Sequence, residues 1–222
     1  MAFFSCHAKI DGVVKDGGAA DLKLKAALGN RTTALIRSLR FFMGEGAEKP
    51  ILDGPAIARS MALAPGIQSV ELQNADSQNL EGTIIISNLS NFLALSAGKG
   101  RFITFTEGRD ASSLVITLER DYAPEIISLL SPEVEEYLSA LMAPVVLGEA
   151  MTRQEYLALV ASIYGPPLSG EIAASRIKAS IEFPRLIRSI RGGRASGKLA
   201  EFDVPLLDIL VLENPLSYEV SW

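Results

Sequence analysis

The residue types that most often carry chemistry in proteins are scarce in this chain, and two of them are adjacent. Cys6 is the only cysteine and His7 the only histidine. A single cysteine excludes an internal disulfide and a cysteine-based zinc cluster, and the rest of the chain lacks the usual general base and the usual metal ligand. The counts therefore exclude Ser-His-Asp and Cys-His catalysis outside the N-terminal tip, and they predict no cofactor and no metal site.

Carboxylates and arginines remain as the only other candidates for catalysis. Glu107, Arg109 and Asp110 occupy one polar segment, and they would form an active site only if they met Arg188 or Arg191 in a single cleft. Nothing in the spacing gives the paired carboxylates that acid/base catalysis requires. We therefore predict that the protein is not an enzyme, with a carboxylate/arginine enzyme as the alternative.

A basic segment is the strongest candidate for a binding surface. Seven basic residues and a single acid, Glu182, lie between Arg176 and Lys198. Such a segment can bind an anionic membrane surface or an acidic protein partner, and the alternative is a solvated hairpin whose charge is balanced by acids elsewhere. The net charge of −5 and the lack of aromatic residues between Arg185 and Lys198 argue against nucleic acid. The predicted contact residues are Arg185, Arg188, Arg191, Arg194 and Lys198.

The N-terminal sequence Ser5-Cys6 resembles the end of a bacterial lipoprotein signal, in which a small residue precedes the cysteine that is acylated. Phe4 departs from that pattern, and the charged and apolar regions that precede such a cysteine are absent. Lipid attachment at Cys6 is one interpretation, and an unmodified cysteine is the other. The first places the protein on the periplasmic side of the cell envelope, and the second leaves a cytoplasmic location open.

The elements that must position these residues are indicated by turn and cap signals. Alternating segments at 8–14 and 20–26 flank a turn with Asp-Gly, typical of a hairpin. Asn30, Asp53 and Thr152 are placed to cap helices, the last with Glu155 in a capping box. Further helices are predicted at 88–95, 124–130 and 132–142, with a short one near 206–210, and strands at 67–72, 82–87, 101–106, 113–119, 171–183, 197–202 and 216–222.

Hairpins interrupted by helices predict an α+β fold with a mainly antiparallel sheet and packed helices. The 222 residues suffice for a single domain spanning 1–222, and 48% of them are apolar. No run approaches the roughly 18 apolar residues that a membrane-spanning helix needs, so the chain is expected to be soluble. The apolar content is compatible with a cavity lined by Leu, Ile and Phe, and equally with a well-filled core.

The segment from Ile181 to Leu212, with its Phe183-Pro184 and Val204-Pro205-Leu206 steps, resembles the closing segment of LppM-like bacterial envelope lipoproteins. Cys6 followed by a strand and the Asp16-Gly17-Gly18 turn is similar to their start. The resemblance covers about a quarter of the chain and leaves out Arg31 to Glu171. It implies an α+β lipoprotein that binds a lipid, an apolar ligand or a partner protein rather than catalysing a reaction. A structural or interaction module that uses the basic hairpin is the alternative.

Overall fold

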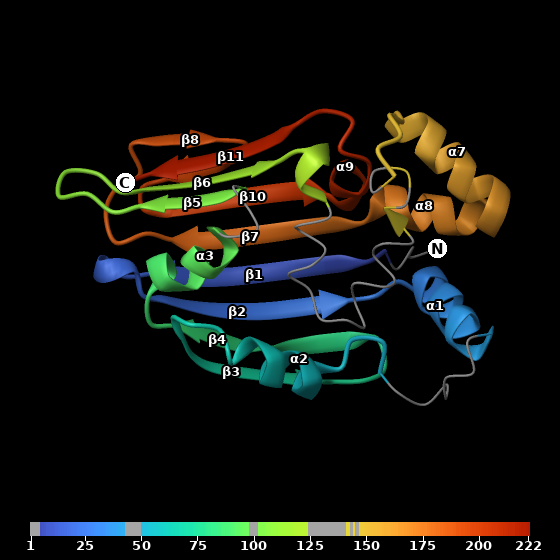
Figure 1. The fold of residues 1–222 in the computed structure, drawn as a ribbon, viewed down its shortest axis with the longest axis horizontal. Coiled ribbons are helices and arrows are strands. Elements are labelled where there is room, and N and C mark those ends of the chain that lie inside the picture. The colour runs from blue at the N-terminus through green and yellow to red at the C-terminus, as the bar shows by residue number, and fades with distance from the viewer. Residues whose placement is uncertain (1–4, 43–49, 98–101, 124–140, 143, 145–146) are drawn as a thin grey trace.

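The computed structural model describes residues 5–42, 50–97, 102–123, 141–142, 144 and 147–222, which form two β-sheets with helices at one end and against one face (Figure 1). The predicted α+β class is confirmed, because nearly all neighbouring strands run antiparallel and several helices pack on them. The helices predicted at 124–130 and 132–142 lie outside the described residues, apart from 141–142. No helix of the described residues is both long and apolar enough to cross a membrane.

The predicted N-terminal hairpin forms the middle of the larger sheet. Strand β1 (His7–Val14) pairs antiparallel with β2 (Ala20–Ala27), and Val14 lies opposite Ala20. A short 3-10 turn, η1 (Asp16–Gly18), joins them, and Gly17 and Gly18 adopt the positive φ angles that this reversal requires. The Asp-Gly signal therefore located the turn correctly.

The larger sheet has seven strands in the order β3-β4-β2-β1-β7-β10-β9. Its only parallel pair is β1 with β7, and all its other neighbours are antiparallel. The remaining strands of this sheet are β3 (Ile67–Asn74), β4 (Asn79–Ile86), β7 (Arg176–Glu182), β9 (Arg194–Ser196) and β10 (Leu199–Pro205).

A second sheet, in the order β5-β6-β11-β8, packs against one part of the first. Its strands are β5 (Ile103–Thr106), β6 (Ser113–Leu118), β8 (Ser189–Arg191) and β11 (Leu216–Ser221). Phe183 and Trp222 are both buried between the two sheets, with ring centroids 4.4 Å apart. Alternation along the strands supplies this core, since every second residue of a strand faces the same side.

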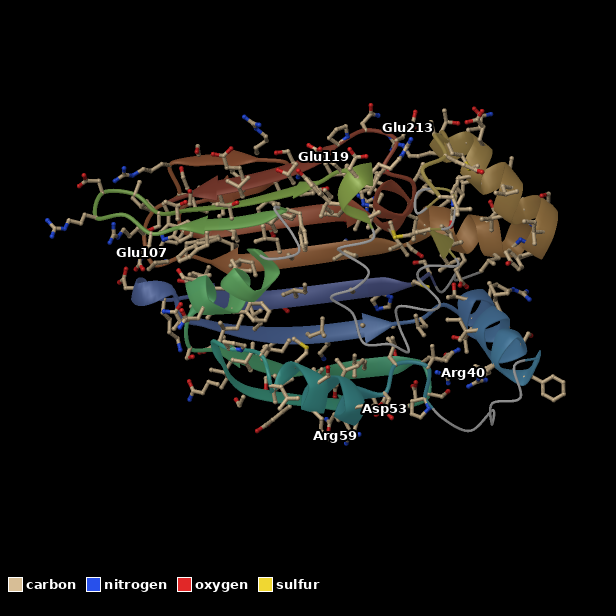
Figure 2. The ribbon with its side chains drawn as sticks, in the orientation of Figure 1. Arg40, Asp53, Arg59, Glu107, Glu119 and Glu213 are labelled. Carbon is tan, nitrogen blue, oxygen red and sulfur yellow. The ribbon has the colours of Figure 1, made fainter. Side chains whose placement is uncertain are left out.

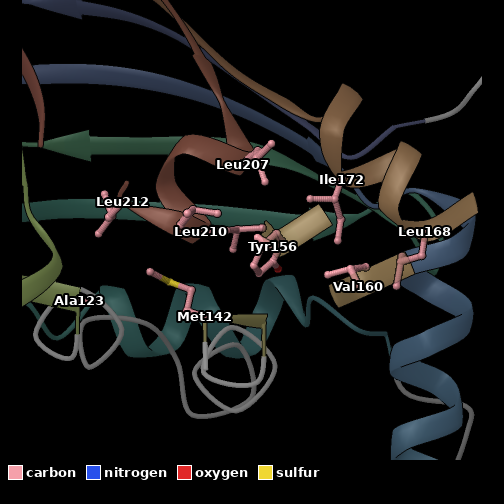
Figure 3. Close-up of a cluster of buried hydrophobic side chains, with 10 residues drawn as sticks. Ala123, Met142, Tyr156, Val160, Leu168, Ile172, Leu207, Leu210 and Leu212 are labelled. Carbon is pink, nitrogen blue, oxygen red and sulfur yellow. The ribbon is translucent and has the colours of Figure 1, made fainter. Parts of the chain in front are cut away.

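A second core lies at the helical end of the molecule (Figure 3). Tyr156, Val160, Leu168, Ile172 and Leu210 are buried there together. The helices of this end are α1 (Asn30–Phe42), α7 (Arg153–Tyr164), α8 (Pro166–Ala174) and α9 (Leu206–Val211), whereas α2 (Gly54–Met61), α3 (Leu89–Ala97) and η2 (Arg120–Tyr122) lie elsewhere on the sheets.

The strand predicted at 171–183 is wrong over its first part. Pro166 and Pro167 occupy the first turn of α8, where their fixed φ favours a helix, and the helix continues to Ala174 before β7 begins at Arg176. Apolar and polar residues nearly alternate within 171–183, which is typical of a strand and concealed the end of the helix. Ile172 belongs to that helix and is buried in the helical core rather than on a sheet face. The Asp53 and Thr152 caps are confirmed: Asp53 accepts from the Ala56 N–H at 2.9 Å, and Thr152 and Glu155 form the capping box.

Candidate functional site

An apolar groove opens at the helical end between α1, α7 and α8. Its volume is about 330 Å³, within the range of small-molecule sites although at its lower end. Leu35 and Ile36 contribute from α1, and Leu168 from α8. The other side chains that line it are Thr32, Leu141, Pro144, Leu147, Glu149, Tyr156, Leu159, Val160, Ile163 and Tyr164. The groove can therefore hold a narrow apolar chain, with polar groups confined to a few positions.

Helix α7 supplies the exposed wall of this groove. Its apolar residues cover more of the helix than one buried stripe, so only part of them can face the core. Tyr156 and Val160 are buried, but Ile163 on the same helix is 60% exposed and lies on the groove. Leu159 is also exposed. This unusually wide apolar face was the signal in the sequence that pointed to a groove, and it was missed.

Hydrogen bonds fix the walls relative to each other. The Tyr156 hydroxyl donates to the Leu141 carbonyl at 2.9 Å, and the Ser169 hydroxyl of α8 donates to the Leu157 carbonyl of α7 at 2.9 Å. Burial, with a smaller contribution from Tyr164, raises the pKa of Tyr156 well above its ordinary value of 10.0, so this hydroxyl remains a donor at physiological pH. The groove is therefore a formed feature with fixed walls.

A buried polar cluster lies next to the groove. The Glu171 carboxylate of α8 accepts hydrogen bonds from the Arg31 N–H at 2.9 Å, the Thr32 N–H at 2.8 Å and the Thr32 hydroxyl at 2.7 Å. A carboxylate at a helix N-terminus satisfies free N–H groups and complements the helix dipole. Asn30 was predicted to cap α1, but it is the first residue of the helix, and Glu171 makes the capping contacts instead. Thr32 connects this cluster to the groove, which it also lines.

Cys6 belongs to the same cluster. It is buried, its Sγ accepts from the Gly29 N–H at 3.1 Å, and its thiol donates to the Thr32 hydroxyl at 3.3 Å. A thioether-linked lipid on this sulfur would remove the S–H that donates to Thr32 and would need space at a buried position, so residues 5–6 would have to turn outward to accept it. Lipid attachment at Cys6 stays a prediction of the sequence alone.

Intact mass of the full gene product, expressed in a bacterial host and extracted with detergent, tests this prediction. Acylation is expected to add the mass of acyl chains and to remove everything before Cys6. An unmodified mass that retains the residues before Cys6 would contradict lipid attachment and would assign the buried thiol to packing. The Cys6→Ser variant, which cannot form the thioether, is the matched control for any mass increase.

The basic segment is divided between two sheets rather than gathered on one surface. In β8, Arg191 lies opposite Glu219, and in β9, Arg194 lies opposite Glu201. Lys198 donates to the Pro184 carbonyl at 2.8 Å. Arg185 and Arg188 are exposed near the start of this segment. The five predicted contact residues thus have three different surroundings, and the spacing of the basic residues does not indicate this division.

Arg194 also lines a larger hollow, about 700 Å³, on the polar face of the seven-stranded sheet. Oppositely charged side chains are paired within it, Lys9 with Asp11 at 2.7 Å and Arg176 with Asp203 at 2.6 Å. The hydrogen bond from Arg176 is the main cause that lowers the pKa of Asp203. Because these two ion pairs are exposed to water, where ion pairs contribute little, this hollow is a weaker candidate than the apolar groove.

The residues of the alternative enzyme do not converge among the described residues. Glu107, Arg109 and Asp110 are exposed in the turn between β5 and β6, and Figure 2 shows Glu107 at the end of the sheets away from α1, α7 and α8. No ion pair of the described residues joins this turn to Arg188 or Arg191; its one contact with the basic segment is the Arg109 carbonyl, which accepts from Arg185 at 3.0 Å. The described part of the chain also contains no cluster of three or more potential metal ligands.

The fold and the groove together define a two-sheet α+β protein with an apolar groove at its helical end. No protein-family model and no curated protein matches the chain. Among solved structures, the folded domain of LppM from Mycobacterium tuberculosis, determined by NMR, is similar, with a TM-score of 0.44 and 9% sequence identity over 100% of this chain and 91% of that one. This is a distant structural relation to a lipoprotein domain.

Proposed function

We propose that this protein is a non-enzymatic binding protein that holds one acyl chain of a lipid in the groove between α1, α7 and α8. The observation that carries the proposal is the groove itself, about 330 Å³ and lined mainly by Leu, Ile, Val and Tyr side chains. Ile163 and Leu147 are exposed to water at this groove, and covering them with a hydrocarbon chain removes apolar surface from water. An enzyme would need reactive side chains in the groove, and few of the side chains that line the groove are polar.

The size of the groove limits the ligand. At the lower end of the volumes of ligand sites, it suits a single chain rather than both chains of a phospholipid. Each methylene group that enters contributes about 0.8 kcal/mol, which corresponds to an affinity increase of roughly four-fold. Affinity for a series of fatty acids should therefore rise with chain length and then reach a plateau when the groove is full.

The cell envelope is the proposed location, with attachment to the membrane as its finer form. This part of the proposal rests on the resemblance of the two terminal segments to LppM-like lipoproteins. The groove adds support because the cell envelope is rich in lipids. Binding of a protein partner and an interaction module that uses the basic hairpin remain the alternatives.

Replacing Ile163 by lysine is expected to weaken binding of a fluorescent fatty acid by about ten-fold or more. The side chain is exposed, so folding is preserved, while a charge on the groove wall must be desolvated when an acyl chain enters. The measurement is a titration followed by probe fluorescence. Leu63→Lys is the matched control, because Leu63 is 86% exposed and does not line the groove. Equal affinities for the two variants would rule out the groove as the site.

A further inference from the structure

The loop between β7 and β8 presents an exposed leucine between two arginines. Leu186 is 66% exposed, and Arg185 and Arg188 on either side of it are exposed as well. A single exposed leucine needs no explanation by itself. Its position within a segment, 183–198, that contains five basic residues and no acid is what distinguishes it from the other exposed apolar side chains.

This loop is held in place by the strands around it. The Phe183 N–H donates to the Lys198 carbonyl at 2.9 Å, the Ile187 N–H to the Gly197 carbonyl at 2.9 Å, and the Arg188 N–H to the Ser221 carbonyl at 2.8 Å. Phe183 is buried against Trp222 at the base of the loop. A fixed backbone therefore presents Leu186 to solvent. The loop does not have to lose backbone conformational entropy when it binds.

The charges near Leu186 favour an anionic partner. Arg191 and Arg194 lie opposite Glu219 and Glu201 in the sheets, whereas Arg188 precedes the paired residues of β8 and has no acid opposite it. No ion pair of the described residues involves any of these three arginines. Arg185 donates to the Arg109 carbonyl at 3.0 Å, and its nearest carboxylate is that of the exposed Asp16, 3.9 Å away. Such a long, exposed ion pair is weak and is readily exchanged for a phosphate.

We propose that the loop 183–188 docks on the surface of an anionic phospholipid bilayer, with Leu186 inserted at the level of the headgroups and Arg185 and Arg188 bound to lipid phosphates. An acidic protein would account for the arginines but gives no role to the exposed leucine, whereas a bilayer surface accommodates both. The loop lies at the end of the sheets where the C-terminus is found, away from α7 and α8 (Figure 1). The inference therefore does not depend on the acyl-chain groove.

Sedimentation with lipid vesicles tests this docking surface. The protein is expected to bind vesicles of phosphatidylglycerol and phosphatidylcholine, not vesicles of phosphatidylcholine alone, and to be released by salt. Arg185→Gln combined with Arg188→Gln should weaken partitioning by about 25-fold, since each basic residue near an anionic surface contributes a factor of about five. Leu186→Ser should weaken it by about ten-fold, because the leucine side chain no longer leaves water.

Two matched variants control for net charge and for surface hydrophobicity. Arg191→Gln combined with Arg194→Gln removes the same charge from positions opposite acids, and Leu63→Ser removes a leucine elsewhere that is even more exposed than Leu186. Both should retain nearly wild-type binding. The proposal is overturned if the wild-type protein does not bind the anionic vesicles, or if either control loses as much binding as the loop variant with which it is paired. Fatty-acid affinity is read separately, so failure of the groove and failure of the docking loop are distinguishable.

Discussion

Gly29→Ala is expected to lower the free energy of unfolding by about 3–4 kcal/mol, one of the two largest effects we predict for a single substitution. The physical reason is a close approach rather than a turn. A Cβ added at Gly29 would overlap the carboxyl group of Glu171, which cannot retreat without leaving its three donors on α1. Gly29 is therefore the residue that lets α8 reach the N-terminus of α1.

Displacing Glu171 has consequences for the whole helical end. The Arg31 N–H, the Thr32 N–H and the Thr32 hydroxyl would lose a charged acceptor in a largely buried place, and a buried donor left without a partner costs about 1–3 kcal/mol. Because α1 also carries Leu35 and Ile36 of the groove wall, fatty-acid affinity should fall together with stability.

Equilibrium unfolding in urea, followed by the fluorescence of Trp222, measures this change. Gly170→Ala is the matched control, since Gly170 lies in α8 beside Glu171 and an added Cβ meets no neighbour there. This control should be neutral or slightly stabilising, because alanine favours helix over glycine by about 1 kcal/mol. If Gly29→Ala were as stable as Gly170→Ala, the Glu171 contacts would carry little of the stability of the helical end.

The parts of the fold that the sequence predicted well are those decided within a few residues. Asp53 caps α2 through the Ala56 N–H, and Thr152 and Glu155 close a capping box within one turn. The hairpin of β1 and β2 follows from Asp16-Gly17-Gly18. In each case the interacting groups are near neighbours in the chain, so residue types at fixed spacing are sufficient.

The cap of α1 could not be predicted in that way, because it comes from Glu171, about 140 residues from Arg31 along the chain. The error at 171–183 has a related origin. Glu171 lies in α8, but its partners on α1 are distant in the chain, so nothing close to it in the sequence indicated that it is helical. The groove is likewise assembled from α1, α7, α8 and residues near 141–149. Only the wide apolar face of α7, which includes Leu159 and Ile163, was local evidence of it.

The basic segment shows the same limit for charge. The arginines predicted as contact residues are exposed, but the pairing of β8 with β11 and of β9 with β10 places Glu219 and Glu201 opposite two of them. Which cations remain available to a partner depends on strand register, and register was not predictable from the spacing of the arginines. Arg185 and Arg188 both precede β8, which begins at Ser189, so strand pairing does not move them away from Leu186.

Trp222→Ala is expected to destabilise the protein by about 3–5 kcal/mol, as removal of a buried tryptophan does in other cores. Trp222 is almost fully buried between the two sheets, with Phe183 at 4.4 Å and Phe105 at 6.1 Å between ring centroids. Its backbone exchanges two hydrogen bonds with Ser112, at 2.9 and 3.0 Å, which extend the pairing of β6 with β11 and hold this end of the two inner strands in register. Alanine keeps these backbone bonds but leaves a cavity against both aromatic rings.

Thermal or urea unfolding followed by far-UV circular dichroism measures this effect, since the variant has no tryptophan. Trp222→Phe is the control: it retains an aromatic contact with Phe183 and should recover at least half of the lost stability. Equal stability of the two variants would mean that the cavity collapses and that ring packing contributes little. Because Phe183 begins the loop that presents Leu186, we also expect Trp222→Ala to weaken binding to anionic vesicles more than Trp222→Phe, which connects the core between the sheets to the proposed docking surface.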